Sequence, residues 1–223
     1  MKNSILLSTR SNKVLSQKVA EKLDIKLCNV NIIDFADAEI SVEVLENIRR
    51  QEVFIIAGTS TQSNKNVDIM ELMLLVDAVK RSSPERITVL FPYLPYARQD
   101  RRIQRSPISS SVFAQMLSYS GIDSVIATDL HTLQIQGFFS NNVVCEHIST
   151  LNTLKNHIED NNYDCIVAGD IGGTGRARYF ANLLDLPIAI IDKRRPEPGV
   201  SKVMHIIGDV KGKRCCIVDD IVD

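Results

Sequence analysis

The sequence predicts an α/β protein of two domains with mainly parallel sheets. Short β-branched runs alternate with stretches of helical period along the 223 residues, an order typical of β-α-β units. The run VFIIAGT at 53–59 is continuously apolar, as expected for a central strand covered on both faces. The alternation starts again after residues 145–150. We therefore expect one domain at 1–147 and a second, incomplete domain at 148–223.

Each element is predicted from its periodicity. A strand at 5–8 precedes Leu15, Val19 and Leu23, which recur every four residues on one helix face. EISVEVLE at 39–46 alternates apolar and polar residues, the pattern of a half-buried strand. The first domain continues with strand 53–59, a mostly buried helix 69–81, strand 86–91, a helix 110–120 ended by Gly121, and strand 124–130. The second has helix 151–158, strand 164–170, helix 175–185, and strands 187–192 and 214–220.

Composition and charge argue against several classes of protein. The formal net charge of -1 does not suit a general nucleic-acid-binding surface. The N-terminal apolar stretch is broken by Ser8 and Arg10 and is too short for a signal peptide or membrane span. The five cysteines form no CxxC pair, and those in β-like runs (Cys165, Cys215 and Cys216) are predicted to be buried, inert thiols. We expect a cytoplasmic protein with no nucleic-acid or membrane partner.

Polar segments follow five of the predicted strands. They are PYLPYARQDRRIQRSPIS (92–109), DLH (129–131), GDIGGTGR (169–176), DKRRPEPG (192–199) and DDIVD (219–223). In open α/β sheets, ligands bind outside the carboxyl ends of the strands. A polar loop explains any one segment, but the five together indicate a binding site.

The segment GDIGGTGR has the residues of a phosphate-binding turn. Gly172, Gly173 and Gly175 at a helix start let backbone N–H groups approach an anion, although such turns also occur without a ligand. Asp170 is a candidate Mg²⁺ ligand, since Mg²⁺ takes few protein carboxylates together with substrate phosphates. His131 at a strand end is either a metal ligand or a packed or surface residue.

Two other segments admit a functional and a plain structural interpretation. Lys193, Arg194 and Arg195 precede two prolines and a glycine, which predicts an exposed, mobile loop that closes over a polyphosphate. The alternative is a solvated charged face. FADAE, at 35–39, places an aromatic residue and two acids at a turn between strands, and the structural alternative places Phe35 in the core.

Six motifs in order resemble the ribose-phosphate pyrophosphokinase (PRPP synthetase) family of bacterial and animal type: FADAEISVEVLENIR, PYLPYARQDRR, TDLHTLQIQGFF, DKRRPEPG, IIGDVKGK and CCIVDDIVD. The resemblance implies two phosphoribosyltransferase-like domains. It implies transfer of diphosphate from ATP to the 1-hydroxyl of ribose 5-phosphate, giving PRPP and AMP, with Mg²⁺ required. It also implies a homo-oligomer, which is a hexamer in the family.

The resemblance implies roles for individual residues. For ATP these are Phe35, Asp37 and Glu39, in a loop that reaches the nucleotide of a neighbouring subunit, and Arg98, Gln99 and Asp100. For magnesium they are His131 and Asp170. Lys193 matches the catalytic lysine and Arg195 its partner, which also contacts ribose 5-phosphate. Asp219, Asp220 and Asp223 match the start of the loop that binds ribose 5-phosphate.

The chain departs from the family pattern at three points. Gly169 and Gly175 stand where the family usually has proline and lysine. Family members continue past the last aspartates through a glycine-rich turn, so we expect a truncated chain with an incomplete ribose 5-phosphate site and little or no activity. A catalytically inactive homologue that binds or regulates a full-length synthetase is the alternative. A phosphoribosyltransferase is disfavoured, because that class lacks ARQDR together with DKRRP.

Overall fold

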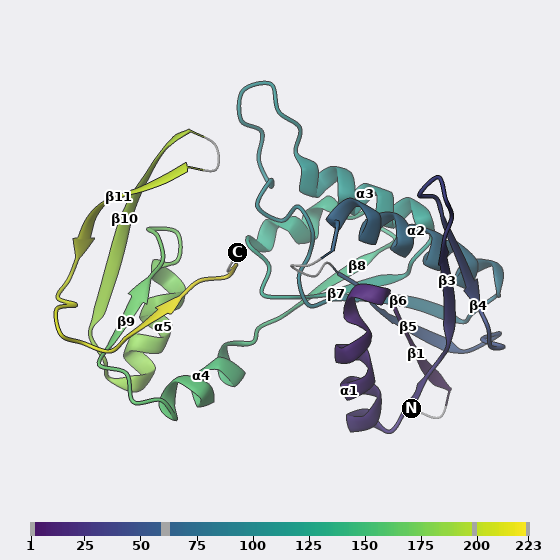
Figure 1. Ribbon diagram of the computed structural model, residues 1–223, viewed down its shortest axis with the longest axis horizontal. Helices are drawn as coiled ribbons and strands as arrows, with labels where there is room; N and C mark the ends of the chain where they lie inside the picture. The colour runs from purple at the N-terminus through teal and green to yellow at the C-terminus, as the bar shows by residue number, and fades with distance from the viewer. Residues whose placement is uncertain (1–2, 59–62, 198–199, 222–223) are drawn as a thin grey trace. The chain divides into compact units, whose positions relative to one another are not determined.

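A computed structural model describes residues 3–58, 63–197 and 200–221, with the backbone alone at 193–197 and 200–204. The chain divides into two compact units, Met1–Ile148 and Ser149–Asp223. Each is a mainly parallel sheet with helices packed on it (Figure 1). The predicted α/β class is confirmed.

The first unit is built on a six-stranded parallel sheet in the order β2-β1-β5-β6-β7-β8. Its strands are β1 (Ser4–Ser8), β2 (Lys26–Leu27), β5 (Glu52–Ile56), β6 (Arg86–Phe91), β7 (Ser124–Thr128) and β8 (Val144–Ile148). As predicted, β5 is central and pairs with β1 and β6. Strands β2 and β8 were not predicted. All carboxyl ends of these parallel strands lie at one edge of the sheet.

Helices cover both faces of this sheet. They are α1 (Lys13–Leu23), preceded by the 3-10 turn η1 (Arg10–Asn12), α2 (Lys65–Arg81) and α3 (Ser109–Ser120), with a second 3-10 turn η2 (Leu133–Phe138). α2 and α3 pack on the face that carries the main core, where Phe91 meets Phe113 edge to face at 5.8 Å. α1 packs through Ala20 on the other face. α3 ends as predicted at Gly121, whose φ of +93° suits a residue without a side chain.

A two-stranded antiparallel hairpin stands apart from the sheet. It consists of β3 (Val30–Asp34) and β4 (Ile40–Val44) (Figure 1). Val42 and Val44 pack against the main core, so the base of the hairpin is held by apolar contacts. At the tip, Phe35 N donates to Glu39 O at 2.8 Å, and Phe35 is 53% exposed. The alternative that places Phe35 in the core is therefore wrong.

The second unit has a four-stranded sheet in the order β11-β10-β9-β12. Its elements are α4 (Leu151–Glu159), β9 (Cys165–Ala168), α5 (Thr174–Leu184), β10 (Ile188–Glu197), β11 (Val200–Ile207) and β12 (Cys215–Val218). β9 is central and pairs in parallel with β10 and β12. Phe180 of α5 is fully buried against this sheet, in a core that includes Ile166 and Val218.

The segment 192–199 was predicted to be a loop, and this prediction is wrong as far as Glu197. β10 continues to that residue and pairs antiparallel with β11, which was not predicted. The register shifts between Asp192 and Lys193, where the hairpin leaves the parallel part of the sheet. A ribbon of two antiparallel strands needs no continuous apolar run, and the charged sequence therefore resembled a loop.

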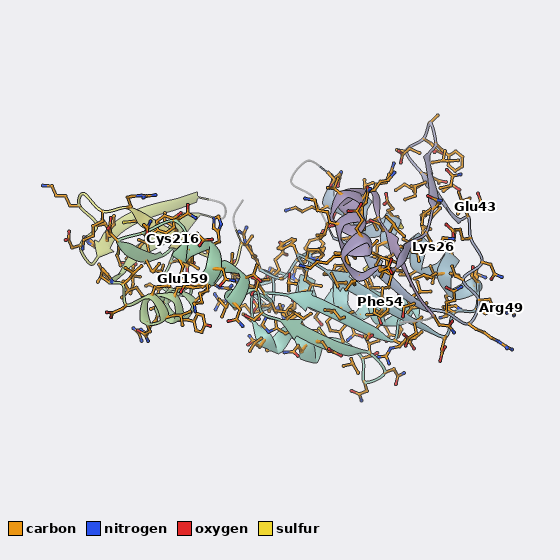
Figure 2. The ribbon with its side chains drawn as sticks, turned by 90° about the horizontal axis from the view of Figure 1, so that it is seen from below. Lys26, Glu43, Arg49, Phe54, Glu159 and Cys216 are labelled. Carbon is orange, nitrogen blue, oxygen red and sulfur yellow. The ribbon has the colours of Figure 1, made fainter. Side chains whose placement is uncertain are left out.

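The thiols are mostly shielded from solvent. Cys165 is fully buried as predicted, whereas Cys215 and Cys216 are half-buried. Cys216 is labelled in Figure 2, on the ribbon of the second unit. Burial raises the pKa of Cys28 and of Cys145 to about 11, so these thiols are poor nucleophiles at neutral pH. Among the described residues, no helix combines the length and apolarity that a membrane crossing requires.

Candidate active site

The segment Arg98–Asp100 lies between the carboxyl end of β6 and the start of α3. Gln99 is held by the first turn of α3 through three hydrogen bonds. Its side-chain Oε1 accepts from Ser109 Oγ at 2.6 Å. Its backbone oxygen accepts from the N–H and the hydroxyl of Ser110, both at 3.1 Å. The segment is therefore fixed in the middle, while Arg98 and Gln99 remain exposed to solvent.

His131 follows the next strand of the same sheet. Thr128 Oγ1 donates to Pro92 O at 2.6 Å, and Thr132 Oγ1 donates to Asp100 Oδ2 at 2.8 Å. These bonds join the segment after β7 to the segment after β6. The predicted ATP residues and the predicted metal histidine thus belong to two adjoining loops at one sheet edge. His131 is exposed there.

In the second unit, Asp170 closes the turn between β9 and α5. Its Oδ1 accepts from Gly173 N at 2.9 Å. A side-chain oxygen that accepts a backbone N–H just before a helix stabilises the helix entry. The segment GDIGGTGR is therefore a strand-to-helix turn, as its glycines predicted, with the carboxylate folded back over it.

Asp219 and Asp220 follow β12 and lie beside that turn. Asp219 Oδ1 accepts from Asp220 N at 2.9 Å. A Cβ placed on Gly169 would lie 2.6 Å from Asp219 Oδ2, so the absence of a side chain at Gly169 allows this carboxylate to approach. Burial raises the pKa of Asp219, and the hydrogen bond to the Asp220 carboxyl and the charge of Asp170 raise it further. Three acids are therefore concentrated at the carboxyl ends of two adjacent strands.

Among the residues that the structure describes, no group of three or more His, Cys, Asp or Glu side chains is arranged to hold a metal ion by itself. Mg²⁺ does not require such a group, because it keeps several waters and is bound by one or two carboxylates with substrate phosphates. The half-buried Asp170 carboxylate, oriented by its bond to Gly173 N, is a donor of this kind.

The other predicted site residues lie elsewhere or are only partly described. Asp37 and Glu39 are exposed at the hairpin tip with Phe35, where Asp37 Oδ1 accepts from Glu39 N at 3.1 Å. Lys193 and Arg195 are in β10, where the structure describes only their backbone. Asp223 lies outside the described residues.

The hydroxyls that support the site were not predicted from the sequence. Ser109, Ser110 and Thr132 hold Gln99 and Asp100. Two signals were available: a pair of serines at a predicted helix start, and a threonine directly after His131. Neither signal shows which residue the hydroxyl binds, since Thr132 and Asp100, for example, are 32 residues apart in the sequence.

Comparison with known proteins gives matches over most of the chain. Residues 4–121 match the model of the N-terminal domain of ribose phosphate pyrophosphokinase, and residues 150–223 match that of the phosphoribosyl transferase domain. A ribose-phosphate pyrophosphokinase of Nitrosomonas europaea is 44% identical, covering 96% of this chain and 67% of the relative. One from Neisseria meningitidis serogroup A is 45% identical, covering 99% of this chain and 68% of the relative.

A solved structure gives the same match. The phosphoribosylpyrophosphate synthetase from Mycobacterium smegmatis superposes with a TM-score of 0.85 at 34% identity, covering 97% of this chain and 71% of that one. The chain spans about two thirds of the length of the relatives it matches.

Proposed function

The chain belongs to the ribose-phosphate pyrophosphokinase family, and from this premise we propose that it transfers the β,γ-diphosphate of ATP to the 1-hydroxyl of ribose 5-phosphate, giving PRPP and AMP. We assign an N-terminal phosphoribosyltransferase-like domain with the ATP-binding loop to residues 1–147, and a partial C-terminal phosphoribosyltransferase-like domain to 148–223. The observation that carries the proposal is the Thr132–Asp100 hydrogen bond of 2.8 Å, which joins the candidate nucleotide segment to the loop of the candidate metal histidine.

Nucleotide binding is assigned to Arg98, Gln99 and Asp100. Arg98 is exposed at the sheet edge, where a guanidinium forms strong charged hydrogen bonds with phosphate oxygens. Gln99 and Asp100 are fixed by hydroxyl groups, so little conformational entropy remains to be lost when a ligand binds. This preorganisation supports the assignment.

A Mg²⁺ ligand is assigned in each unit, His131 in the first and Asp170 in the second. The carboxylate of Asp170 is the donor type that Mg²⁺ prefers, and its orientation by Gly173 N supports the role. When bound, the ion neutralises phosphate charge during transfer. The protein contributes an oriented oxygen donor on a short turn, held next to the N-terminus of α5.

Diphosphate transfer requires the ribose hydroxyl to meet the β-phosphorus in line, so catalysis consists mainly of positioning and charge neutralisation. We assign charge neutralisation to Lys193 and Arg195. We assign binding of the ribose hydroxyls to Asp219, Asp220 and Asp223. Carboxylates accept hydrogen bonds from hydroxyls, and the first two acids lie beside the Asp170 turn.

We further propose a cytoplasmic homo-oligomer in which Phe35, Asp37 and Glu39 contact the ATP of a neighbouring subunit. The exposure of Phe35 at the tip of a hairpin that stands apart from the sheet supports this role, since an exposed aromatic side chain is typical of a contact residue. The five cysteines are free thiols, which suits a reducing compartment.

PRPP and AMP formation from ATP, Mg²⁺ and ribose 5-phosphate tests the activity. Lys193→Ala should lower the rate by about 100-fold, the effect of removing one charge-stabilising group. Lys202→Ala is the matched control, because Lys202 is in the partner strand of the same ribbon, in register with Arg194. Equal rates in wild type and Lys193→Ala would refute the role of Lys193.

The same assay separates the proposed enzyme from the alternative. A catalytically inactive homologue would bind ATP and form no PRPP above a reaction without protein, and that result would overturn the proposed activity.

A further inference from the structure

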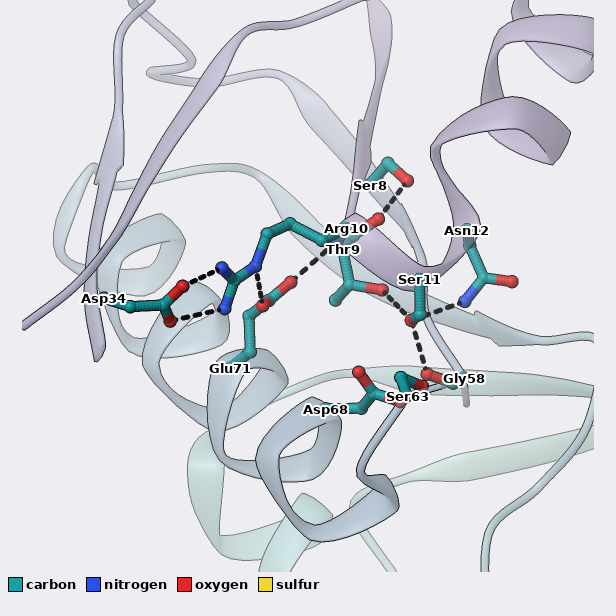
Figure 3. A network of polar contacts seen from close by, with 10 residues as sticks. All are labelled: Ser8, Thr9, Arg10, Ser11, Asn12, Asp34, Gly58, Ser63, Asp68 and Glu71. Carbon is teal, nitrogen blue, oxygen red and sulfur yellow. Dashed lines mark hydrogen bonds and ion pairs between the residues drawn. The ribbon is translucent and has the colours of Figure 1, made fainter. Parts of the chain in front are cut away.

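Arg10 connects three elements of the first unit. It begins η1, directly after β1, and its side chain extends between α2 and the β3–β4 hairpin (Figure 3). Its Nε donates to Glu71 Oε2 at 2.7 Å, and its backbone N donates to Glu71 Oε1 at 2.7 Å. The outer nitrogens, Nη1 and Nη2, donate to the two carboxylate oxygens of Asp34 at 2.5 and 2.9 Å. One guanidinium thus bridges two carboxylates.

Glu71 provides a rigid attachment for this arginine. The residue is in α2 and only 1% exposed, and both of its carboxylate oxygens accept from Arg10. A buried carboxylate needs such partners, because an unpaired charge in the interior costs several kcal/mol. The side chain of Arg10 is therefore fixed against α2 before it reaches the hairpin.

Asp34 is the point at which Arg10 holds the hairpin. It is the last residue of β3, and its register partner is Ile40, the first residue of β4. The base of the hairpin is held by Val42 and Val44 against the core, whereas Asp34 is adjacent to the exposed tip that begins at Phe35. The bidentate pair with Arg10 fixes the direction in which the tip projects, since a planar guanidinium fork constrains orientation as well as distance.

We propose that Arg10 is a positioning residue for nucleotide binding, which orients the tip residues Phe35 to Glu39 through Asp34. The inference rests on the proposed function for the contact of the tip with ATP. The inference that Arg10 fixes the direction of the hairpin tip rests only on its contacts with Glu71 and Asp34. The orientation of the hairpin tip and the binding of ATP are therefore measured separately.

The test uses Asp34→Asn, which keeps the shape of the side chain and removes its charge. Asp77→Asn is the matched control. Asp77 pairs with Arg81 at 2.6 Å on α2 and is 54% exposed, against 57% for Asp34, but its partner is on its own helix. Asp34→Glu restores the carboxylate and should recover the wild-type behaviour.

Amide hydrogen exchange measures the attachment. The amides of Phe35 and Ala38 are hydrogen-bonded within the tip, and their exchange should become about two- to fivefold faster in Asp34→Asn, the modest effect of a solvent-exposed ion pair. The exchange of core amides in β5 should not change. Unchanged tip exchange in Asp34→Asn, or an equal change in Asp77→Asn, would overturn the proposal.

Calorimetric titration of the full chain with ATP measures the functional part. The dissociation constant for ATP should rise about two- to fivefold in Asp34→Asn and return in Asp34→Glu, while the constant for ribose 5-phosphate stays the same. Faster tip exchange with unaltered ATP affinity would refute the role in nucleotide binding. Failure of wild type to form PRPP would instead contradict the proposed function, and the exchange and ATP results would still decide the role of Arg10.

Discussion

Asp170 closes a turn and is proposed to bind Mg²⁺, and paired substitutions distinguish these two roles. Its Oδ1 accepts from Gly173 N at 2.9 Å, and its charge is proposed to bind Mg²⁺. Asp170→Asn keeps an acceptor for Gly173 N and loses the charge, whereas Asp170→Ala loses both. Only the alanine variant should therefore destabilise the turn before α5.

The magnitudes follow from these contacts. Loss of the bond to Gly173 N in Asp170→Ala should cost about 1 kcal/mol, as at other helix entries. Asp170→Asn should stay within about 0.5 kcal/mol of wild type. Both variants should raise the Mg²⁺ concentration that gives the half-maximal rate of PRPP formation by at least about tenfold. Tenfold is the lower figure for the loss of a group that only orients a metal ligand.

Asp164→Asn is the matched control for these variants. Asp164 directly precedes β9, at the opposite end of the strand from Asp170, and its Oδ2 accepts from Arg214 N at 2.8 Å. The substitution therefore changes an aspartate that has the same kind of backbone bond and no proposed metal. Its Mg²⁺ dependence should be that of wild type.

Two measurements decide the outcome. Native-state hydrogen exchange of the β9 amides reports the stability of the second unit alone, and Mg²⁺ titration of the initial rate reports the metal. Unchanged Mg²⁺ dependence in Asp170→Asn would show that Asp170 only closes the turn. Equal stability of the alanine and asparagine variants would show that the Gly173 bond contributes nothing measurable.

Three further predictions concern the hydroxyl, acid and arginine contacts. Thr132→Val should weaken ATP binding in calorimetry by about 1 kcal/mol through the freed Asp100, and Thr132→Ser should restore it; equal affinities of the two variants would refute this. The raised pKa of Asp219 means that its ionisation at neutral pH destabilises the folded state, and that stability is regained as pH falls through the folded pKa. Asp219→Asn should therefore raise the midpoint of thermal unfolding at pH 7, with a gain that shrinks on acidification; a gain that is constant with pH would contradict the assignment. Arg10→Met should lower the free energy of unfolding, measured by the exchange of β5 amides, by about 2 kcal/mol. The reason is that buried Glu71 loses a charged donor, which is itself partly screened by solvent. Adding Glu71→Leu should recover most of that loss, and additive losses in the double variant would show that the two side chains are not coupled.

Local patterns were sufficient to predict the framework. The apolar runs at β5, β6 and β9 and the glycine that ends α3 identify their elements, because each signal is contained in a few consecutive residues. The strand-to-helix turn after β9 was also predicted, from its glycines. These elements determine the fold class and place the candidate residues after the strands.

Contacts between distant residues could not be predicted. Two examples are the bond from Thr132 to Asp100 and the bridge from Arg10 to Asp34 and Glu71, whose partners are 24 to 61 residues apart in the sequence. From the sequence alone, any serine, threonine or arginine could have been the donor. The ribbon of β10 and β11 was not predicted, because these two strands form their backbone hydrogen bonds with each other. Its charged side chains therefore gave no core pattern.

The strand orders of the two sheets imply different folding histories during synthesis. From β5 to β8, each strand of the first sheet pairs with the next one in the chain. This part can therefore grow as the polypeptide emerges, with register partners 34, 36 and 20 residues apart (Glu52 and Arg86, Thr88 and Ser124, Ser124 and Val144). In the second sheet, central β9 pairs with β12, and Cys165 meets Cys215 only after 50 further residues have been made. Until then one apolar edge of β9 has no partner strand, and an unpaired edge promotes association with other chains. The edge of β9 is therefore open to association with other chains between the synthesis of Ala168 and that of Val218.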